Sequence, residues 1–156
     1  MKRFWFLLAL LVVAPSFSGC TEKSAPAPKA ASADEAVDPI QGHLLHAQAK
    51  LPTIRLWLGT EELATEVASR PVEISTGMMF RTNMPENTAM LFVFGNAMRR
   101  SFYMRNCVVP LSAAYMNPEG EITQIIDMKP RDETGIPSAA DNIQFVLEVP
   151  QGWFTR

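Results

Sequence analysis

The amino-acid sequence predicts a mainly β fold, a compact β-sandwich or partly closed barrel with one or two short helices. Short apolar segments follow one another along residues 51–156, and Gly, Pro, Asn and Asp separate them. Several of these segments alternate apolar and polar side chains, which is the pattern of strands with one buried face. No regular exchange of strand and helix patterns is visible, which disfavours a parallel α/β sheet. Short strands joined by turn residues are instead typical of a sandwich or barrel.

Two hairpins are the clearest predicted elements. Residues 54–58 (IRLWL) and 63–68 alternate in hydropathy, and a Gly-Thr turn lies between them. Residues 111–116 and 121–128 flank the sequence NPEG, whose residue types favour a tight turn. Each pair therefore predicts two neighbouring antiparallel strands.

The other predicted strands and the helix follow from local signals. Residues 90–94 (MLFVF) are all apolar and precede Gly-Asn, which predicts a strand that is buried on both faces and ends there. A helix is predicted over 70–79, because a proline stands near its start and a glycine near its end. Further strands are predicted at 101–104 and 145–149, a long surface loop at 129–142, and a turn or helix at 151–156.

Residues 1–20 predict a lipoprotein-type signal peptide. Two basic residues precede an apolar run over 4–14, and small residues then lead to Ser18-Gly19-Cys20. The run is too short for a stable transmembrane helix. Its ending resembles a bacterial lipoprotein box, in which Cys20 is acylated and anchors the protein to a membrane. Phe17 departs from the aliphatic residue usual in that box, so cleavage by the ordinary signal peptidase is the alternative.

The region after Cys20 predicts a tether followed by one domain. Thr21 follows the cysteine in place of aspartate, which by resemblance to Gram-negative sorting rules favours the periplasmic face of the outer membrane. Residues 21–50 are rich in Ala, Pro and Ser and predict a disordered linker. Residues 51–156 are then expected to form a single mainly β domain.

Charge and histidine content exclude several classes of function. The formal net charge is −2, which gives no electrostatic footprint for nucleic acid. The two histidines, His43 and His46, both lie in the predicted linker and could supply at most half of a metal site. The domain therefore lacks Ser-His and Cys-His pairs and histidine-based metal centres. No cofactor or metal is predicted.

Several motifs of the domain resemble a known family. They are GMMFR (77–81), MLFVF (90–94), FYMRNC (102–107), the Pro-Leu pair at 110–111, EGEI (119–122) and LEVPQGW (147–153). In this order and at these spacings they resemble the domain of unknown function 192 family (DUF192), here as an exported lipoprotein-type member. The resemblance implies a compact, mostly β fold without a transferable activity. Ser112 stands where the family usually has aspartate. Family members generally continue about one strand beyond Arg156, so the resemblance implies either an unpaired sheet edge or a C-terminally incomplete domain here.

Four residues are candidates for ligand binding: Arg81, Tyr103, Arg105 and Asn106. Arginine forks suit carboxylate or phosphate ligands. The alternative is that Arg81 or Arg105 pairs with an acidic side chain such as Glu148 or Asp127, or with a loop carbonyl. Arg99 and Arg100, beside a turn, are expected to be solvated.

Sulfur chemistry offers two further candidates. Cys107 is a possible reactive thiol, although the two valines after it favour a buried, inert one. Eight methionines between residues 78 and 128 permit a copper(I) hypothesis. Their places inside apolar strands favour a role as core filler instead.

The function that these observations favour is non-catalytic binding in the cell envelope. The ligand would be a small anionic or sugar-like molecule, or a protein partner. The alternative is a carboxylate-dependent hydrolase acting on envelope polymers, which needs two facing acids among Glu148, Asp127, Asp132 and Glu133. A third hypothesis is a purely structural envelope protein without a pocket.

Overall fold

The computed structural model describes residues 36–156. The predicted signal peptide, Cys20 and the first part of the predicted linker lie outside these residues. In chain order the elements are β1 (Thr53–Leu58), β2 (Glu61–Ala68), α1 (Pro71–Thr76), β3 (Thr88–Met98), β4 (Ser101–Phe102), β5 (Leu111–Met116), β6 (Ile122–Met128), β7 (Ile136–Pro137), β8 (Ile143–Pro150) and the 3-10 helix η1 (Trp153–Thr155). Among residues 36–156, no helix has the length and apolar character needed to span a bilayer.

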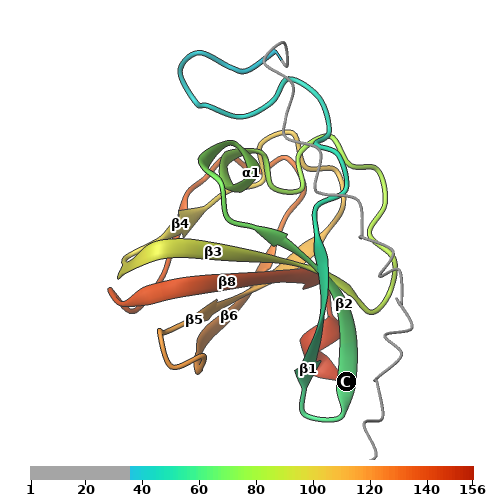
Figure 1. Ribbon diagram of the computed structural model, residues 1–156, viewed down its shortest axis with the longest axis vertical. Coiled ribbons are helices and arrows are strands. Elements are labelled where there is room, and N and C mark those ends of the chain that lie inside the picture. The colour runs from blue at the N-terminus through green and yellow to red at the C-terminus, as the bar shows by residue number, and fades with distance from the viewer. Residues whose placement is uncertain (1–35) are drawn as a thin grey trace, which may run out of the picture.

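One six-stranded sheet forms the body of the domain (Figure 1). Its strand order is β1-β2-β3-β8-β5-β6, and β4 pairs with β7 in a separate two-stranded sheet. Strands β2 and β3 are parallel, and the other neighbours in the large sheet are antiparallel. The large sheet stays open, with β1 and β6 at its edges. The mainly β prediction is therefore confirmed in its sandwich-like form, and the barrel alternative is wrong.

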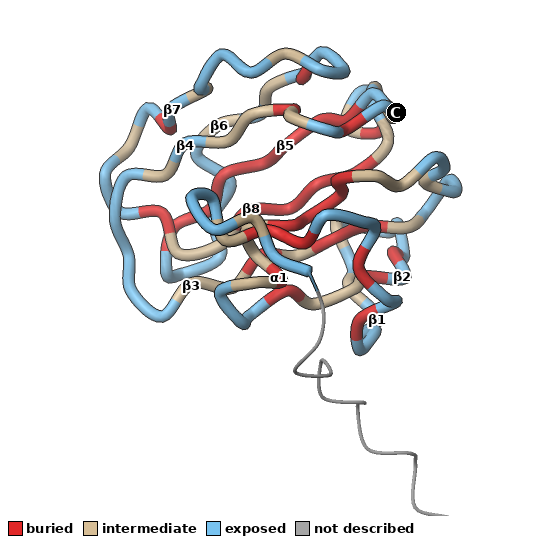
Figure 2. Tube along the Cα trace, turned by 90° about the horizontal axis from the view of Figure 1, so that it is seen from above, coloured by how far each residue is buried: buried red, intermediate tan, exposed pale blue. Residues whose placement is uncertain are grey.

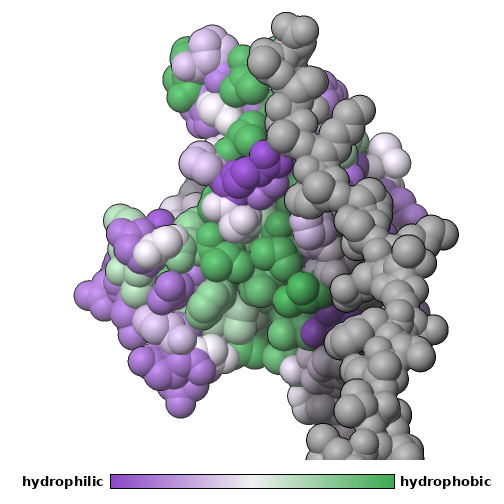
Figure 3. Space-filling view, in the orientation of Figure 1, coloured by the Kyte–Doolittle hydropathy of each residue, from purple (hydrophilic) through white to green (hydrophobic). Residues whose placement is uncertain are grey.

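Two apolar clusters lie on opposite faces of the large sheet. Successive residues of β5 point to opposite faces of the sheet. Ala113 and Tyr115 therefore belong to one cluster, and Ala114 and Met116 belong to the other. All six residues of β5 are buried, and Figure 2 shows buried chain concentrated on β5 and β8. The larger cluster packs the sheet against the segments around α1 and β4. In Figure 3, apolar side chains gather over the middle of the sheet, where β3 and β8 run in Figure 1.

Both predicted hairpins are confirmed, whereas several predicted boundaries are wrong. Strand β3 runs through the Gly-Asn pair to Met98, with a register shift between Val93 and Met98 in its pairing with β8. The shift lets the strand bend past Gly95 without ending. The predicted strand 101–104 is only the two residues of β4, and its partner β7 lies inside the predicted surface loop.

The predicted helix is shorter than expected because Gly77 ends it. Gly77 has a φ of 46°, and its amide donates a hydrogen bond of 2.8 Å to the Glu73 carbonyl. A Cβ at this position would approach the Phe92 ring to 3.1 Å. Glycine is therefore required both by the backbone angle and by the close packing of β3.

The folded region begins before Leu51, in contrast to the expectation of a disordered linker up to residue 50. The Leu44 amide donates to the Thr76 hydroxyl oxygen at 2.9 Å, and the Gln48 side chain donates to the Gly77 carbonyl at 2.8 Å. His43, Leu44 and Gln48 are each less than a tenth exposed. We call residues 36–50 the strap. It is ordered because its polar groups bond to groups at the end of α1.

Candidate functional site

The sequence motifs of the domain meet on the face of the large sheet that α1 covers. The Phe80 amide, just after α1, donates to the Asn106 carbonyl in the loop after β4 at 2.8 Å. On the sheet itself, Met90 of β3 lies opposite Glu148 of β8. Segments that are far apart in sequence therefore surround one volume.

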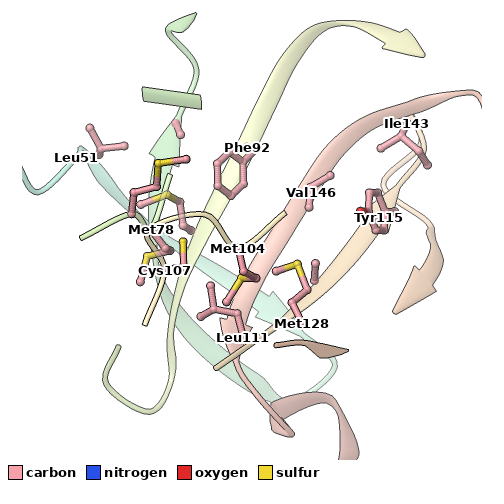
Figure 4. Close-up of a cluster of buried hydrophobic side chains, with 14 residues drawn as sticks. Leu51, Met78, Phe92, Met104, Cys107, Leu111, Tyr115, Met128, Ile143 and Val146 are labelled. Carbon is pink, nitrogen blue, oxygen red and sulfur yellow. The ribbon is translucent and has the colours of Figure 1, made fainter. Parts of the chain in front are cut away.

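A pocket of about 340 Å³ occupies this volume. Its apolar walls carry thioethers and aromatic rings: Met78, Met79, Phe92, Phe94, Phe102 and Tyr103. Cys107 and Glu148 are buried and form its inner end, whereas Gln41 of the strap and Arg99 are exposed and mark its mouth. Figure 4 shows the labelled side chains Met78, Phe92 and Cys107 in the buried cluster beside it. The pocket thus runs from a charged mouth to an acidic inner end.

Glu148 is the unusual residue of the pocket. It is 4% exposed, and its Oε2 atom is buried without a hydrogen-bond partner among the described residues. Burial raises the pKa of its carboxyl from 4.5 to about 8. At neutral pH the carboxyl of Glu148 is therefore largely protonated. Buried polar atoms in native proteins are almost always paired, so an unpaired one beside a pocket needs an explanation.

The titratable neighbours of Glu148 are neutral at physiological pH. Burial, and secondarily the negative charge of ionised Glu148, raise the pKa of the Cys107 thiol to about 12. The same two causes raise the pKa of Tyr115 to about 12. The Tyr115 hydroxyl donates to the Ile136 carbonyl at 2.7 Å, so it is not oriented by the glutamate. Cys107 stays protonated, which makes it a poor nucleophile.

Two arginines at the pocket have guanidinium groups without a carboxylate partner. Within residues 36–156, ion pairs join five arginines to glutamates, and neither Arg99 nor Arg100 is among them. The Arg100 guanidinium stacks on the Phe94 ring at 3.9 Å, and its Nε donates to the Ile143 carbonyl at 3.4 Å. Arg99 makes only a long contact of 3.5 Å to the Ala139 carbonyl. Nη2 of Arg100 also donates to the Asn96 carbonyl and, at 3.0 Å, to the Asn96 side-chain oxygen. Neither guanidinium charge is balanced by a carboxylate, so both can attract an anion.

The comparisons with known proteins agree with this arrangement of motifs. The sequence model of the DUF192 family, described as "Uncharacterized ACR", matches residues 55–156. The chain belongs to the DUF192 family. The match covers β2 to η1 and therefore every wall of the pocket except the part that the strap contributes.

Two solved structures share the fold of this DUF192 chain. One is a protein of unknown function from Novosphingobium aromaticivorans DSM 12444, with 28% identity, a TM-score of 0.64, and coverage of 80% of this chain and 86% of that one. The other is a "putative transcription regulator" from Sinorhizobium meliloti 1021, with 27% identity, a TM-score of 0.64, and coverage of 70% and 88%. A comparison with curated proteins gives no match.

The four predicted ligand-binding residues of this DUF192 domain are not brought to one place. Tyr103 lines the pocket. Arg81 instead forms a two-point ion pair with Glu66 beside a smaller cavity. Arg105 pairs with the exposed Glu133 at 2.7 Å, on the surface. Asn106 has a φ of 56° and holds the loop through its carbonyl.

The residues that sequence reasoning did not select are Arg99, Arg100 and, as the inner end of a pocket, Glu148. A signal for Glu148 exists in the sequence, because FVLEV places a single acid inside an otherwise apolar strand. If such a strand is central and covered on both faces, the side chain of the acid is buried whichever face it points to. The arginines carry no comparable signal, since residues beside a turn are usually solvated.

The residues on which the hydrolase and copper(I) hypotheses depend do not gather into one site. Of the four candidate acids only Glu148 lines the pocket, and Asp127 accepts a hydrogen bond from Ser112 on the neighbouring strand. Among residues 36–156, no cluster of three His, Cys, Asp or Glu side chains could hold a metal ion. Five of the methionines belong to the buried cluster: Met78, Met79, Met90, Met104 and Met128. In this position they fill the core.

Proposed function

We propose that this DUF192 protein is a non-catalytic binding domain of the cell envelope, whose pocket takes a small molecule with an anionic group. The observation that carries the proposal is the unpaired carboxyl of Glu148 at the inner end of an open, apolar pocket. A fold that only had to be stable would gain from an apolar residue there. A ligand that bonds to the carboxyl explains why the acid is present.

The anionic group of the ligand is assigned to the mouth of the pocket. Arg99 and Arg100 offer guanidinium charge there without a carboxylate partner, whereas the guanidinium groups of Arg81 and Arg105 are already engaged by glutamates. The proposal therefore moves anion binding from Arg81 and Arg105 to Arg99 and Arg100. Tyr103 stays in the proposed site as part of the wall.

Binding is favoured over hydrolysis by the chemistry of the lining. Hydrolysis of a glycosidic bond needs two carboxyl groups on opposite sides of the substrate. The lining residues of this pocket include one carboxyl, and the thiol beside it has a pKa of about 12. The net charge of −2 likewise gives no reason to extend a role in transcription from the Sinorhizobium relative to this chain.

The binding site is tested by a thermal-shift and calorimetric screen of small carboxylates, phosphate esters and sugars. We expect an anionic member with an apolar body to stabilise the wild-type protein. Arg99→Gln and Arg100→Gln should weaken that effect. Arg55→Gln, which removes an exposed arginine of β1 away from the pocket, is the matched control and should not. If no compound acts more strongly on the wild type than on the two pocket variants, the small-molecule proposal is wrong and protein partners become the better hypothesis.

The envelope location rests on the sequence of residues 1–20. Acylation of Cys20 would hold the domain at a membrane surface, because each buried methylene contributes about 0.8 kcal/mol. Metabolic labelling with an alkyne fatty acid, followed by membrane fractionation, tests this part. Label should enter the wild type and not Cys20→Ser, and an unlabelled wild type would contradict the tether.

A further inference from the structure

The inner end of the pocket is an acid without a counterion. Glu148 takes part in none of the ion pairs among residues 36–156. The titratable groups that face it, Cys107 and Tyr115, have pKa values of about 12 and carry no positive charge. Arg99 and Arg100 line the same pocket but lie toward its mouth. An ionised Glu148 therefore has no cation of this chain beside it.

The aromatic walls of the pocket are suited to a cation. Phe102 packs edge to face against Phe92, with ring centroids 5.0 Å apart and planes at 81°, and against Phe94, at 6.4 Å and 86°. Rings at right angles present both edges and faces, and the faces of aromatic rings attract positive charge. The guanidinium of Arg100 already stacks on one of these faces, at 3.9 Å from the Phe94 centroid. The aromatic wall of this pocket therefore already contacts one cation, the guanidinium of Arg100.

We propose that the ligand is a zwitterion, with an alkylammonium group inserted toward Glu148 and an anionic group at Arg99 and Arg100. An apolar spacer between the two charges would lie along the Phe and Met side chains. The inference rests on the proposed function and adds the chemical class of the ligand. The inserted ammonium supplies the missing counterion, and the anionic end offsets the repulsion that two arginines exert on any cation entering the mouth.

Binding of such a ligand has a defined proton balance. Before a ligand binds, the carboxyl of Glu148 is mostly protonated below its pKa of about 8. When the ammonium takes its place beside the carboxyl, the carboxylic acid loses its proton to solvent and forms an ammonium–carboxylate pair. A ligand with a neutral hydroxyl at the inner end, as in a sugar, would leave the proton on Glu148. The two ligand classes therefore differ in the number of protons released.

The test uses three matched series of probes on the whole protein: ω-aminoalkanoates, ω-hydroxyalkanoates and plain alkanoates of increasing chain length. At neutral pH we expect an aminoalkanoate to bind at least about tenfold more tightly than its hydroxy counterpart. Calorimetry in buffers of different ionisation enthalpy should show release of nearly one proton. Glu148→Gln should abolish both the preference and the release, whereas Glu61→Gln, an exposed carboxyl of β2, should change neither.

Results that differ from these expectations contradict either the zwitterion inference or the binding function. If hydroxyalkanoates or alkanoates bind as tightly as aminoalkanoates, or if wild-type binding releases no proton, the zwitterion inference is wrong while the binding function stands. If no probe of the three series binds but other anions of the functional screen do, the inference is again wrong. If both screens are empty, the proposed function itself fails. The proton count is measured on the wild type, so the test does not depend on the folding of Glu148→Gln.

Discussion

Arg81 and Glu66 form a two-point ion pair, with Nη1 to Oε1 at 2.6 Å and Nη2 to Oε2 at 2.8 Å. Their side chains are 18% and 13% exposed, and Glu66 also accepts the Leu51 amide at 2.7 Å. The pair joins the segment after α1 to β2 and to the chain entering β1. An arginine that sequence reasoning favours for ligand binding is thus part of the scaffold.

We expect Arg81→Met to destabilise the domain by about 3 kcal/mol, because it leaves a largely buried carboxylate without its partner. Chemical denaturation of the purified protein measures this. Arg55→Met is the matched control: its pair with Glu62 is 3.4 Å long and both side chains are exposed, so a change of at most about 0.5 kcal/mol is expected. Equal effects of the two variants would show that the Arg81 pair is not structural.

The same pair predicts loss of stability in acid. Burial alone would raise the pKa of Glu66, but hydrogen bonds from Arg81 and from the Leu51 amide outweigh it, and the net pKa lies below 4.5. The folded state therefore holds fewer protons on Glu66 than the unfolded state around the ordinary pKa. Its contribution to stability is present above that value and is lost as the pH falls through the folded pKa. Arg81→Met should remove this part of the loss of stability in acid. If the free energy of unfolding of the variant falls with decreasing pH as steeply as that of the wild type, the prediction is wrong.

Glu148 predicts a pH dependence of the opposite sign. Its carboxyl keeps a proton up to a pH of about 8 in the folded protein, but releases it around 4.5 in the unfolded chain. Between these values the folded state binds more protons, so the free energy of unfolding falls as the pH rises, by up to about 1.4 kcal/mol per pH unit. The loss is complete above the folded pKa.

Glu148→Gln isolates this contribution because it keeps the shape of the side chain and removes its titration. The stability of the variant relative to the wild type should rise steadily from mildly acidic to mildly alkaline pH in urea titrations. Glu61→Gln, an exposed glutamate on β2, controls for the general loss of a negative charge. A difference between Glu148→Gln and wild type that is independent of pH would mean that the buried acid is not protonated at neutral pH.

Cys107 should be unreactive in the folded protein. The residue is 5% exposed, and the pKa of its thiol is raised to about 12, first by burial and then by Glu148. In a Cys20→Ser background, where Cys107 is the sole thiol, a thiol reagent at neutral pH should label the protein only after denaturant is added. Val108→Cys, added with Cys107→Ser, places a thiol at a neighbouring side chain that is 41% exposed and should react at once. Rapid native labelling of Cys107 would reopen a role in thiol chemistry.

The sequence predicted the parts of the fold that depend on local pattern. Both hairpins follow from alternation around a turn, and the pairing of β1 with β2 and of β5 with β6 needs no information from elsewhere in the chain. Long-range pairing was not predictable in this way. The parallel contact of β2 with β3 and the central place of β8 between β3 and β5 depend on how the faces of separate segments pack. The expected end of the strand at Gly95-Asn96 is wrong because the strand continues through these residues to Met98 with a register shift.

The candidate site was less predictable than the fold because partners decide which polar side chains are free. Arg81 and Arg99 are the same residue type in equally turn-rich surroundings. Only the structure shows that Glu66 engages Arg81, whereas Arg99 faces the pocket mouth. The strap shows the same limit. It directly follows Ala-, Pro- and Ser-rich sequence that resembles a linker, and contacts such as that of Gln48 hold it to the end of α1.

Substitution of Gln48 should weaken the attachment of the strap to the end of α1. It is 7% exposed, and its Nε2 donates to the carbonyls of Gly77 at 2.8 Å and of Glu73 at 3.2 Å. Gln48→Leu keeps the bulk of the side chain and leaves these carbonyls at the end of α1 without that donor. We expect a loss of stability of about 1–3 kcal/mol and faster hydrogen exchange in α1 and the strap.

The control variant is His46→Leu, which changes an exposed residue of the same strap and should have little effect on stability or on hydrogen exchange. Because Gln41 of the strap lines the pocket mouth, Gln48→Leu should also weaken ligand binding, whereas unchanged exchange and binding would show that the strap is not held by Gln48.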